Sequence, residues 1–389
     1  MMNFRSAYIP ALLTGIESPI KQVKLYNNHD ASWFTDLAYF YHPHMLVSYY
    51  YSGKIFEYRK MLRILDDIEL WADSGGYSLA TQGGEIDVRK VLKWQEHNAN
   101  VAFSLDLPPS STENTTRISP GKHSYHTLEK FERNAEISRQ NNLDFMTLRT
   151  SDKLKIYNVI HGYSNETIDL WWDYATKDVQ FEGYATGLKP SSDALLQAMC
   201  IMKLYDKGVR KNLHLLGVAG ITVIPLIVWC SQYIDRISFD STSYGYGSRT
   251  RAYVYPDRIR DYTHFGKKYL TKKNPMKKLY CECPICQDVK TVDYFCESNV
   301  TWPGLLISLH NLWCFQNYTN LLNQTLHAEK NKEKFIALIK THTGDWADKT
   351  LYAINFVEDC MKYGYDKAYS MYFQEHDSSK QKFARQKLI

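Results

Sequence analysis

The sequence lacks a long hydrophobic run. Its longest apolar stretch, GVAGITVIPLIVWC at 217–230, contains Pro225 and is shorter than the roughly 18 residues that a membrane-spanning helix needs. The opening residues also lack the basic segment, the long apolar core and the small-residue cleavage site of a secretory signal. We therefore expect no membrane partner and a cytoplasmic location.

A strong charge of one sign is also absent. The 389 residues carry a formal net charge of +5, which permits an anionic partner such as a nucleic acid but does not require one. No internal repeat or low-complexity tract is visible. With 23% charged and 44% hydrophobic residues, the composition is that of an ordinary globular protein with a sizeable core.

Short apolar runs recur along the chain, and several are separated by segments with a helical pattern. Continuous apolar strands between helices indicate a parallel sheet that is buried on both faces. Eight such runs favour an α/β fold of the (β/α)₈ barrel type, with a doubly wound open sheet as the alternative. The eight runs are 7–15, 45–51, 68–76, 101–109, 156–162, 183–187, 213–220 and 236–241, and the clearest helices are expected at 87–98, 125–142 and 192–208.

Polar residues or glycine stand at the carboxyl ends of five of these runs. They are Asp73, Asp106, His161, Gly187 and Asp240. A single aspartate at a strand end is usually a turn cap, because its side chain accepts backbone N–H groups. In a barrel, however, the carboxyl ends of all strands meet at the catalytic rim. The pattern therefore favours the barrel and predicts a site at that rim.

The regular alternation of strands and helices ends near residue 270. We expect a barrel core at 1–270, a zinc-binding subdomain at 271–330 packed on the barrel, and a charged helical C-terminal extension at 331–389. The last helix expected within the barrel, at 192–208, has Ser192 as its candidate N-terminal cap and Gly208 at its end.

Three of the eight cysteines lie within six residues, as Cys281, Cys283 and Cys286 in CECPIC. Without a secretory signal, this spacing indicates a metal site rather than disulfides. A fourth ligand from the following residues would close a tetrahedral Zn²⁺ site of the structural kind. Both His310, which gives Cys₃His, and Cys296, which gives Cys₄, are candidates for that position.

Taken together, these segments resemble the tRNA-guanine transglycosylase superfamily, a family of zinc-containing barrels that exchange guanine for a 7-deazaguanine base. The similarity runs in order from about residue 40 to about residue 325. The matching segments are ADSGGYSL, FSLDLPP, VIHGYS, GYATGL, RISFDSTSYGYGSRTR and CECPIC followed by HNLW. The last of these is similar to the family's zinc motif and favours His310 over Cys296.

The resemblance implies roles for the acidic residues. Asp240 would be the nucleophile that attacks the anomeric carbon and forms a covalent glycosyl-enzyme ester, and Asp73 would be the general acid/base. Asp106 would accept hydrogen bonds from the guanine N1–H and 2-amino groups. His161 stands where the family has glutamine and would donate to the base oxygen as the appropriate tautomer, and Gly187 would present its backbone N–H to the same oxygen.

The ADSGGYSL segment supplies the remaining base-binding candidates. Tyr77 stands in place of the family's phenylalanine and could stack on the base, while Ser74 and Gly75 would border it. The family's acidic residue for an aminomethyl cation would fall near Ser192, which is neutral. This favours the neutral base 7-cyano-7-deazaguanine (preQ0) as the incoming substrate.

Departures from the family pattern bear on whether the nucleic-acid substrate is tRNA or DNA. The segment after the nucleophile, which in the family handles the tRNA anticodon, is rewritten here but keeps Arg249 and Arg251. These residues and Lys189 are the candidates for nucleic-acid binding. The rewriting favours the DNA-modifying branch of the family, found with phages and restriction-type systems, so the compartment would be the host cytoplasm if a phage encodes the chain.

Two alternatives remain open from the sequence. One is a divergent tRNA-guanine transglycosylase that acts on tRNA. The other is a non-catalytic barrel subunit that binds nucleic acid, but such a subunit would be expected to lose the nucleophile or the acid/base, and this chain keeps both. A homodimer or a partner subunit is compatible with either enzyme reading.

Overall fold

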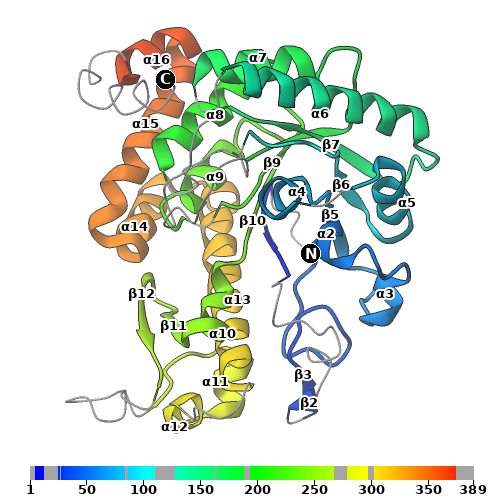
Figure 1. The fold of residues 1–389 in the computed structure, drawn as a ribbon. Helices are drawn as coiled ribbons and strands as arrows, with labels where there is room; N and C mark the ends of the chain where they lie inside the picture. Colours follow the sequence, from blue (N-terminus) through cyan, green and yellow to red (C-terminus); the bar gives the residue numbers. More distant parts are fainter. Residues whose placement is uncertain are drawn as a thin grey trace.

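Eight parallel strands form one nearly closed barrel in the computed structural model (Figure 1). The structure describes residues 5–12, 25–26, 28–83, 86–109, 128–162, 164–187, 193–218, 220–266, 278–296 and 302–373. In sheet order the strands are β1 (Ser6–Pro10), β10 (Arg236–Ser241), β9 (Asn212–Leu215), β8 (Gly183–Thr186), β7 (Lys155–Ile160), β6 (Val101–Phe103), β5 (Glu69–Asp73) and β4 (His44–Ser48).

The two ends of this sheet meet, which distinguishes a barrel from an open doubly wound sheet. Ala11 pairs in parallel with Leu46, and the Leu12 N–H donates to the Leu46 carbonyl at 2.8 Å. All eight apolar runs of the sequence contain a strand of the barrel, so the prediction of a (β/α)₈ fold is confirmed.

Helices cover the outside of the barrel (Figure 1). Those that follow the barrel strands are α2 (Tyr49–Ser52), α3 (Tyr58–Met61), α4 (Gly76–Gln82), α5 (Val88–Asn98), α6 (Leu128–Leu148), α7 (Asn165–Ala175), α8 (Ala194–Asp206), α9 (Ile224–Cys230), α10 (Tyr246–Thr250) and α13 (Trp302–Asn323). The N-terminal cap of α8 is Asp193, whose carboxylate accepts from the Leu195 and Leu196 N–H groups at 3.0 and 3.2 Å; Ser192 lies outside the described residues.

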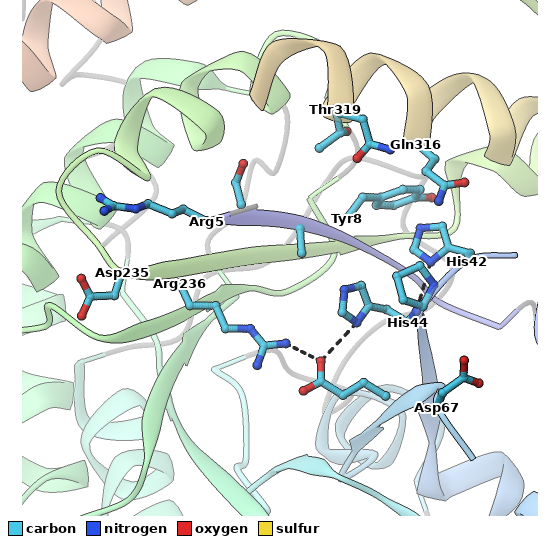
Figure 2. A pocket seen from close by; sticks show the side chains of 14 residues that line it. Arg5, Tyr8, His42, His44, Asp67, Asp235, Arg236, Gln316 and Thr319 are labelled. Atoms are coloured by element: carbon cyan, nitrogen blue, oxygen red, sulfur yellow. Dashed lines mark hydrogen bonds and ion pairs between the residues drawn. The ribbon is translucent and has the colours of Figure 1, made fainter. Parts of the chain in front are cut away.

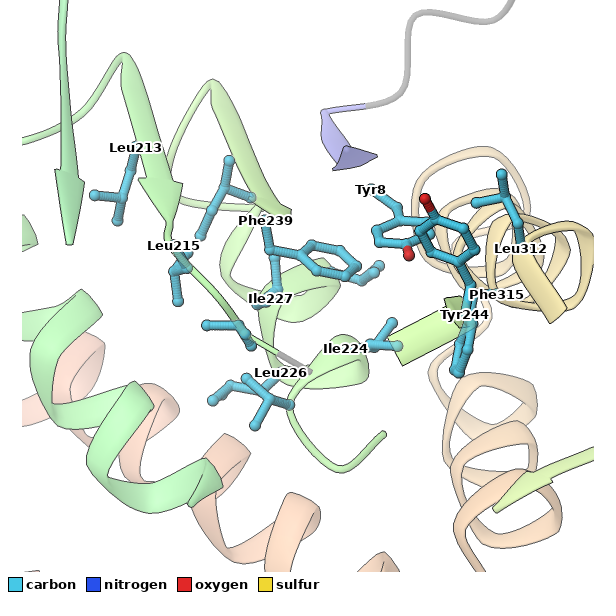
Figure 3. Packing of buried hydrophobic residues seen from close by; sticks show 14 of the residues in the cluster. Tyr8, Leu213, Leu215, Ile224, Leu226, Ile227, Phe239, Tyr244, Leu312 and Phe315 are labelled. Atoms are coloured by element: carbon cyan, nitrogen blue, oxygen red, sulfur yellow. The ribbon is translucent and has the colours of Figure 1, made fainter. Parts of the chain in front are cut away.

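Side chains alternate between two apolar layers, as the two-residue period of a strand requires. One layer fills the barrel itself, and its larger members are Trp71, Phe103 and Tyr157, all buried. The other layer lies between the strands and the helices and includes Leu213, Leu215 and Phe239, packed near α9 and α13 (Figure 3). Burial of both faces explains why the strands are continuously apolar in the sequence.

Several elements lie outside the barrel sheet. The antiparallel hairpin of β11 (Ala252–Tyr255) and β12 (Arg258–His264) precedes the cysteine segment, which forms α11 (Pro284–Val289) and α12 (Val292–Cys296). Both β11 and α11 pack against α13, which also contacts β1. A second small hairpin, β2 (Leu25–Tyr26) with β3 (His29–Asp30), lies near the N-terminus.

The C-terminal region is helical, as expected from the sequence. It contains α14 (Lys332–Thr343), α15 (Ala347–Tyr363) and α16 (Tyr365–Phe373). Helix α15 packs on α8 and α9, and Glu358 accepts hydrogen bonds from the Trp229 indole at 2.8 Å and from the Tyr233 hydroxyl at 2.6 Å. The extension is therefore joined to the barrel wall. None of the helices in the described ranges is both long and apolar enough to cross a lipid bilayer.

Candidate functional site at the carboxyl-end rim

The five polar or glycine positions expected at the rim all lie at the carboxyl ends of barrel strands. Asp73 is the last residue of β5, His161 and Gly187 directly follow β7 and β8, Asp106 follows β6 by three residues, and Asp240 is the penultimate residue of β10. They come from five different strands, so barrel closure is what brings them together.

The glycines after Asp73 have a steric reason. The backbone turns from β5 directly into α4 with Gly75 at φ +87°, a conformation that favours glycine. A Cβ on Gly76 would lie 2.1 Å from the carbonyl oxygen of Asp106. The two glycines therefore let the β5–α4 turn pack directly against the loop that carries Asp106, which accounts for the Asp-Ser-Gly-Gly pattern.

Asp106 and His161, both predicted to bind the base, are hydrogen-bonded to each other. The His161 Nε2 lies 2.7 Å from Asp106 Oδ2, and both side chains are largely buried. The Ser74 hydroxyl is 3.4 Å from Asp106 Oδ1. When Nε2 carries the proton for this bond, Nδ1 of a neutral ring is an acceptor, and it lies on the side of Gly187, where a Cβ would be 3.7 Å away.

Asp240 is held by groups from β9 and the loop that follows it. Its Oδ1 accepts from the Gly217 N–H at 2.7 Å and lies 3.2 Å from His214 Nε2. His214 was not among the residues singled out from the sequence. The sequence contained a signal for it, because His214 alternates with Leu213 and Leu215 along one strand. Since these two leucines face the helices, His214 must face the barrel interior.

Asp73 has an environment distinct from that of the other rim carboxylates. Burial is the largest cause that raises its pKa, to about 6, and the charges of Asp106 and Asp240 act in the same direction. A carboxyl group with a pKa near neutrality can both give and take a proton, which is the requirement for a general acid/base. Asp106 and Asp240 thus lie close enough to Asp73 for their charges to act on it, which groups the three carboxylates in one site.

The other predicted site residues have varied positions. Tyr77 lies on α4 with 47% of its surface exposed, next to the rim. Arg249 is exposed on α10. Arg251 ends that helix, and its Nη1 donates to the Phe295 carbonyl at 2.9 Å, so part of its guanidinium joins α10 to α12. Lys189 lies outside the described residues.

The Cys₃His group comes together as predicted. One ligand atom from each of Cys281, Cys283, Cys286 and His310 lies within 4.8 Å of the others, and all four residues are buried. Cys296, the alternative fourth ligand, lies on α12 and is not part of this group. Three buried thiols and one buried imidazole are a ligand set that fits a structural Zn²⁺ ion.

The surroundings of the Cys₃His group orient its histidine. The His310 Nε2 donates to the Val254 carbonyl at 2.8 Å, which leaves Nδ1 toward the thiols, 3.3 Å from the Cys283 sulfur. The Tyr253 ring stacks on the imidazole at a centroid distance of 3.8 Å. Such an outer hydrogen bond fixes the tautomer of a ligating histidine. The group therefore joins β11, α11 and α13.

A separate cavity of about 600 Å³ opens at the opposite, amino-terminal end of the barrel. Arg236 and His44 line it (Figure 2), and so does Glu69. The His44 Nδ1 lies 3.1 Å from the Glu69 carboxylate, and Arg236 forms an ion pair with the same oxygen. Glu69 is thus paired with other residues of the cavity wall. Side chains at this end of a barrel generally serve stability, and we assign this network that role.

Comparisons with known proteins add one viral relative. No family model matches the chain. The chain is 26% identical over 268 residues to "Uncharacterized protein 306" of Sulfolobus islandicus rod-shaped virus 1, and the match covers 67% of this chain and 76% of that protein. The printed name of that protein states no activity, so any functional conclusion depends on the site.

Proposed function

We propose that this chain is a transglycosylase that exchanges guanine in DNA for a 7-deazaguanine base through a covalent aspartyl-glycosyl intermediate. One observation carries the proposal: Asp73, Asp106 and Asp240, from three different strands, converge at the carboxyl-end rim in three different environments. Carboxylates in distinct environments can take distinct roles in glycosyl transfer. The resemblance to the guanine transglycosylase superfamily and the Cys₃His group support the same reading.

In the proposed first step, Asp240 attacks the anomeric carbon of the target nucleotide, and the bond from that carbon to guanine breaks. Asp73, with its pKa raised to about 6, gives a proton to the departing base. In the second step Asp73 takes a proton from the incoming 7-deazaguanine, which attacks the same carbon and releases Asp240. Two inversions retain the configuration at the anomeric carbon.

Base recognition would use the outward-facing atoms of the Asp106–His161 pair. Asp106 can accept the guanine N1–H and 2-amino groups, and a carboxylate accepts such donors strongly. His161 can accept a base N–H at Nδ1 as a neutral ring, or donate to the base oxygen there as an imidazolium. The exposed Tyr77 at the rim is the candidate for stacking.

The choice of preQ0 as the incoming base is favoured by Ser192, a neutral residue near the position where the family has an acidic one. The adjacent Asp193 caps α8 by accepting from the N–H groups of Leu195 and Leu196. The choice of DNA is favoured by the rewritten segment around Arg249 and Arg251. Because the anomeric carbon must meet Asp240, a duplex would have to extrude the target nucleotide.

The proposed function is tested by offering the purified, zinc-loaded protein isotopically labelled preQ0 together with double-stranded DNA or bulk tRNA in parallel reactions. We expect label in DNA alone, and we expect Asp240→Asn to abolish incorporation while the zinc content and the circular dichroism spectrum stay unchanged. The matched control is Asp257→Asn, which removes an exposed carboxylate and should leave incorporation intact.

Other outcomes overturn the proposal in distinct ways. Label in tRNA alone would favour the tRNA-modifying alternative. Label in neither nucleic acid would contradict the enzyme reading of the isolated chain and favour the non-catalytic subunit. Full incorporation by Asp240→Asn would overturn the assignment of the nucleophile.

A further inference from the structure

We propose that His214 is a positioning residue that orients the Asp240 carboxylate. In this arrangement Oδ1 accepts the hydrogen bonds that hold the group, and Oδ2 is directed to the reacting carbon. This inference rests on the proposed function in assigning attack to Asp240. It adds a residue that the family resemblance did not indicate and that lies inside the barrel rather than on its rim.

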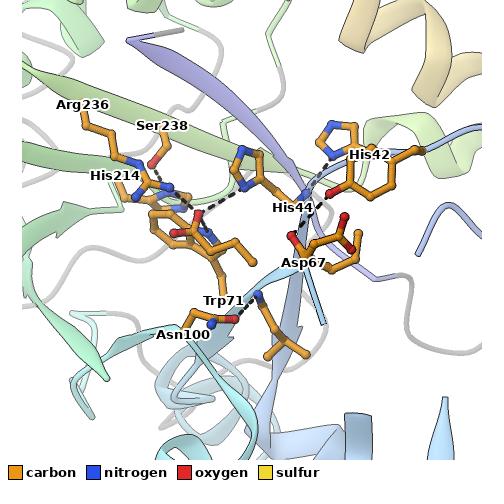
Figure 4. Close-up of polar contacts among 12 residues, drawn as sticks. His42, His44, Asp67, Trp71, Asn100, His214, Arg236 and Ser238 are labelled. Carbon is orange, nitrogen blue, oxygen red and sulfur yellow. Dashed lines mark hydrogen bonds and ion pairs between the residues drawn. The ribbon is translucent and has the colours of Figure 1, made fainter. Parts of the chain in front are cut away.

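The ring nitrogens of His214 have separate partners, both from β10. Nδ1 lies 2.9 Å from the Ser238 hydroxyl, and Nε2 lies 3.2 Å from Asp240 Oδ1. Asp240 as a carboxylate can only accept, so Nε2 must carry the proton, and a neutral ring then accepts at Nδ1 from the Ser238 O–H. Figure 4 shows His214 with Ser238 and Arg236 beside it. The two contacts together determine the tautomer.

The ring has no freedom to turn away from this arrangement. His214 is 0% exposed and lies between the Trp71 and Phe103 rings, at centroid distances of 5.0 and 4.9 Å. Burial is the main cause that lowers the pKa of His214, against the opposing effect of Asp240. A neutral donor suits a positioning role, because it stabilises the carboxylate without cancelling the negative charge that makes Asp240 nucleophilic.

Both donors found for Asp240 within the described residues fall on Oδ1. The second is the Gly217 N–H, from the turn directly after β9, at 2.7 Å. The carboxylate plane is thereby set by β9 and its turn, and Oδ2 carries no hydrogen bond from the described part of the chain. Catalytic groups that are oriented before substrate arrives avoid reorganisation during the reaction.

The first test measures the pKa of the Asp240 carboxyl by carbon-13 NMR of selectively labelled aspartate in the zinc-loaded protein, with Asp240→Asn used to assign the signal. Other charged or titratable groups that influence this pair are Asp73, Tyr8 and Arg236, and they stay in place. We expect His214→Leu to raise the carboxyl pKa relative to the wild type, because the carboxylate loses a hydrogen-bond donor. His214→Gln, which keeps a donor near Nε2, should restore most of the shift.

The second test measures base exchange by the same variants. We expect His214→Leu to lower kcat about 10- to 100-fold with little change in KM and to move the acidic limb of the pH profile upward. Val159→Ala removes packing from the same apolar layer of the barrel without removing a ring that packs on His214, so it is the matched control and should change neither the pKa nor the profile.

The outcomes separate this inference from the proposed function. An unchanged Asp240 pKa in folded His214→Leu overturns the positioning role, whatever the activity. If the wild type exchanges no base in DNA or tRNA but the pKa shift appears, the proposed function fails and the contact between His214 and Asp240 stands. A shift in His214→Leu that His214→Gln does not reverse would assign the effect to packing and also overturn the inference.

Discussion

The raised pKa of Asp73 leads to a stability prediction that does not depend on any substrate. The folded protein holds this carboxyl at a pKa of about 6 instead of its ordinary 3.8, so the native state prefers the protonated form. Stability from this group is present below the ordinary pKa and is lost as the pH rises through about 6. Asp73→Asn removes the titration, so the variant should become more stable relative to the wild type as the pH rises.

The magnitude follows from the size of the shift. A shift of about two units corresponds to about 3 kcal/mol at 1.36 kcal/mol per unit, and this is an upper bound because the side chain is only partly buried and solvent screens its charge. We therefore expect the free energy of unfolding of Asp73→Asn to gain about 1–2 kcal/mol over the wild type between about pH 4.5 and about pH 8.

Urea denaturation of both proteins at the two pH values measures this difference. Comparing pH values cancels any pH-independent effect of the amide. The exposed Asp36 provides the control, since Asp36→Asn should show nearly the same difference from the wild type at both pH values. A pH-independent effect of Asp73→Asn would refute the reasoning, because it would mean that the carboxyl is not buried beside Asp106 and Asp240 in the folded state.

Three further predictions concern the fold. Gly76→Ala should destabilise the protein by about 2–4 kcal/mol in urea denaturation, because the methyl group would meet the Asp106 carbonyl at 2.1 Å. Gly266→Ala should be nearly neutral, because no atom of the described residues lies within 4 Å of its added methyl group. Chelation or Cys286→Ser should lower both the bound zinc measured by elemental analysis and the Tm, because the metal would join the cysteine segment at α11 to His310 on α13; Cys296→Ser should retain the zinc. Glu69→Gln should destabilise the protein by about 1–3 kcal/mol at neutral pH, because Arg236 and His44 lose their carboxylate. Burial opposes ionisation of Glu69, but these partners outweigh it and lower its pKa, so the loss should shrink as the pH falls through the acidic range. Equal effects of Gly76→Ala and Gly266→Ala would contradict the close approach of Gly76 to Asp106. Equal zinc loss in Cys286→Ser and Cys296→Ser would contradict the Cys₃His group, and a pH-independent effect of Glu69→Gln would contradict its ion pair with Arg236.

The amino-acid sequence by itself determined a parallel α/β fold and the place of its site, and it favoured a barrel over an open doubly wound sheet. Continuous apolar runs separated by helices indicate a sheet that is buried on both faces, and their number, eight, is that of a barrel. Because parallel strands all end at one rim, Asp73, Asp106 and Asp240 could be assigned to a common site from their positions at run ends alone. The three cysteines of CECPIC predicted the metal group from local spacing alone, since ligands two and three residues apart can reach one ion.

Only the tertiary structure decided which of these groups touch. The pairing of Asp106 with His161 depends on how the loops after β6 and β7 approach each other, and sequence spacing contains no information on that distance. The choice of His310 over Cys296 was settled by the packing of α13 against β11 and α11. The contact of His214 with Asp240 arises from the stagger between β9 and β10, which sets one strand's inward residues against particular residues of the next. Alternation says which side chains enter the barrel, but the register of the closed sheet selects their partners.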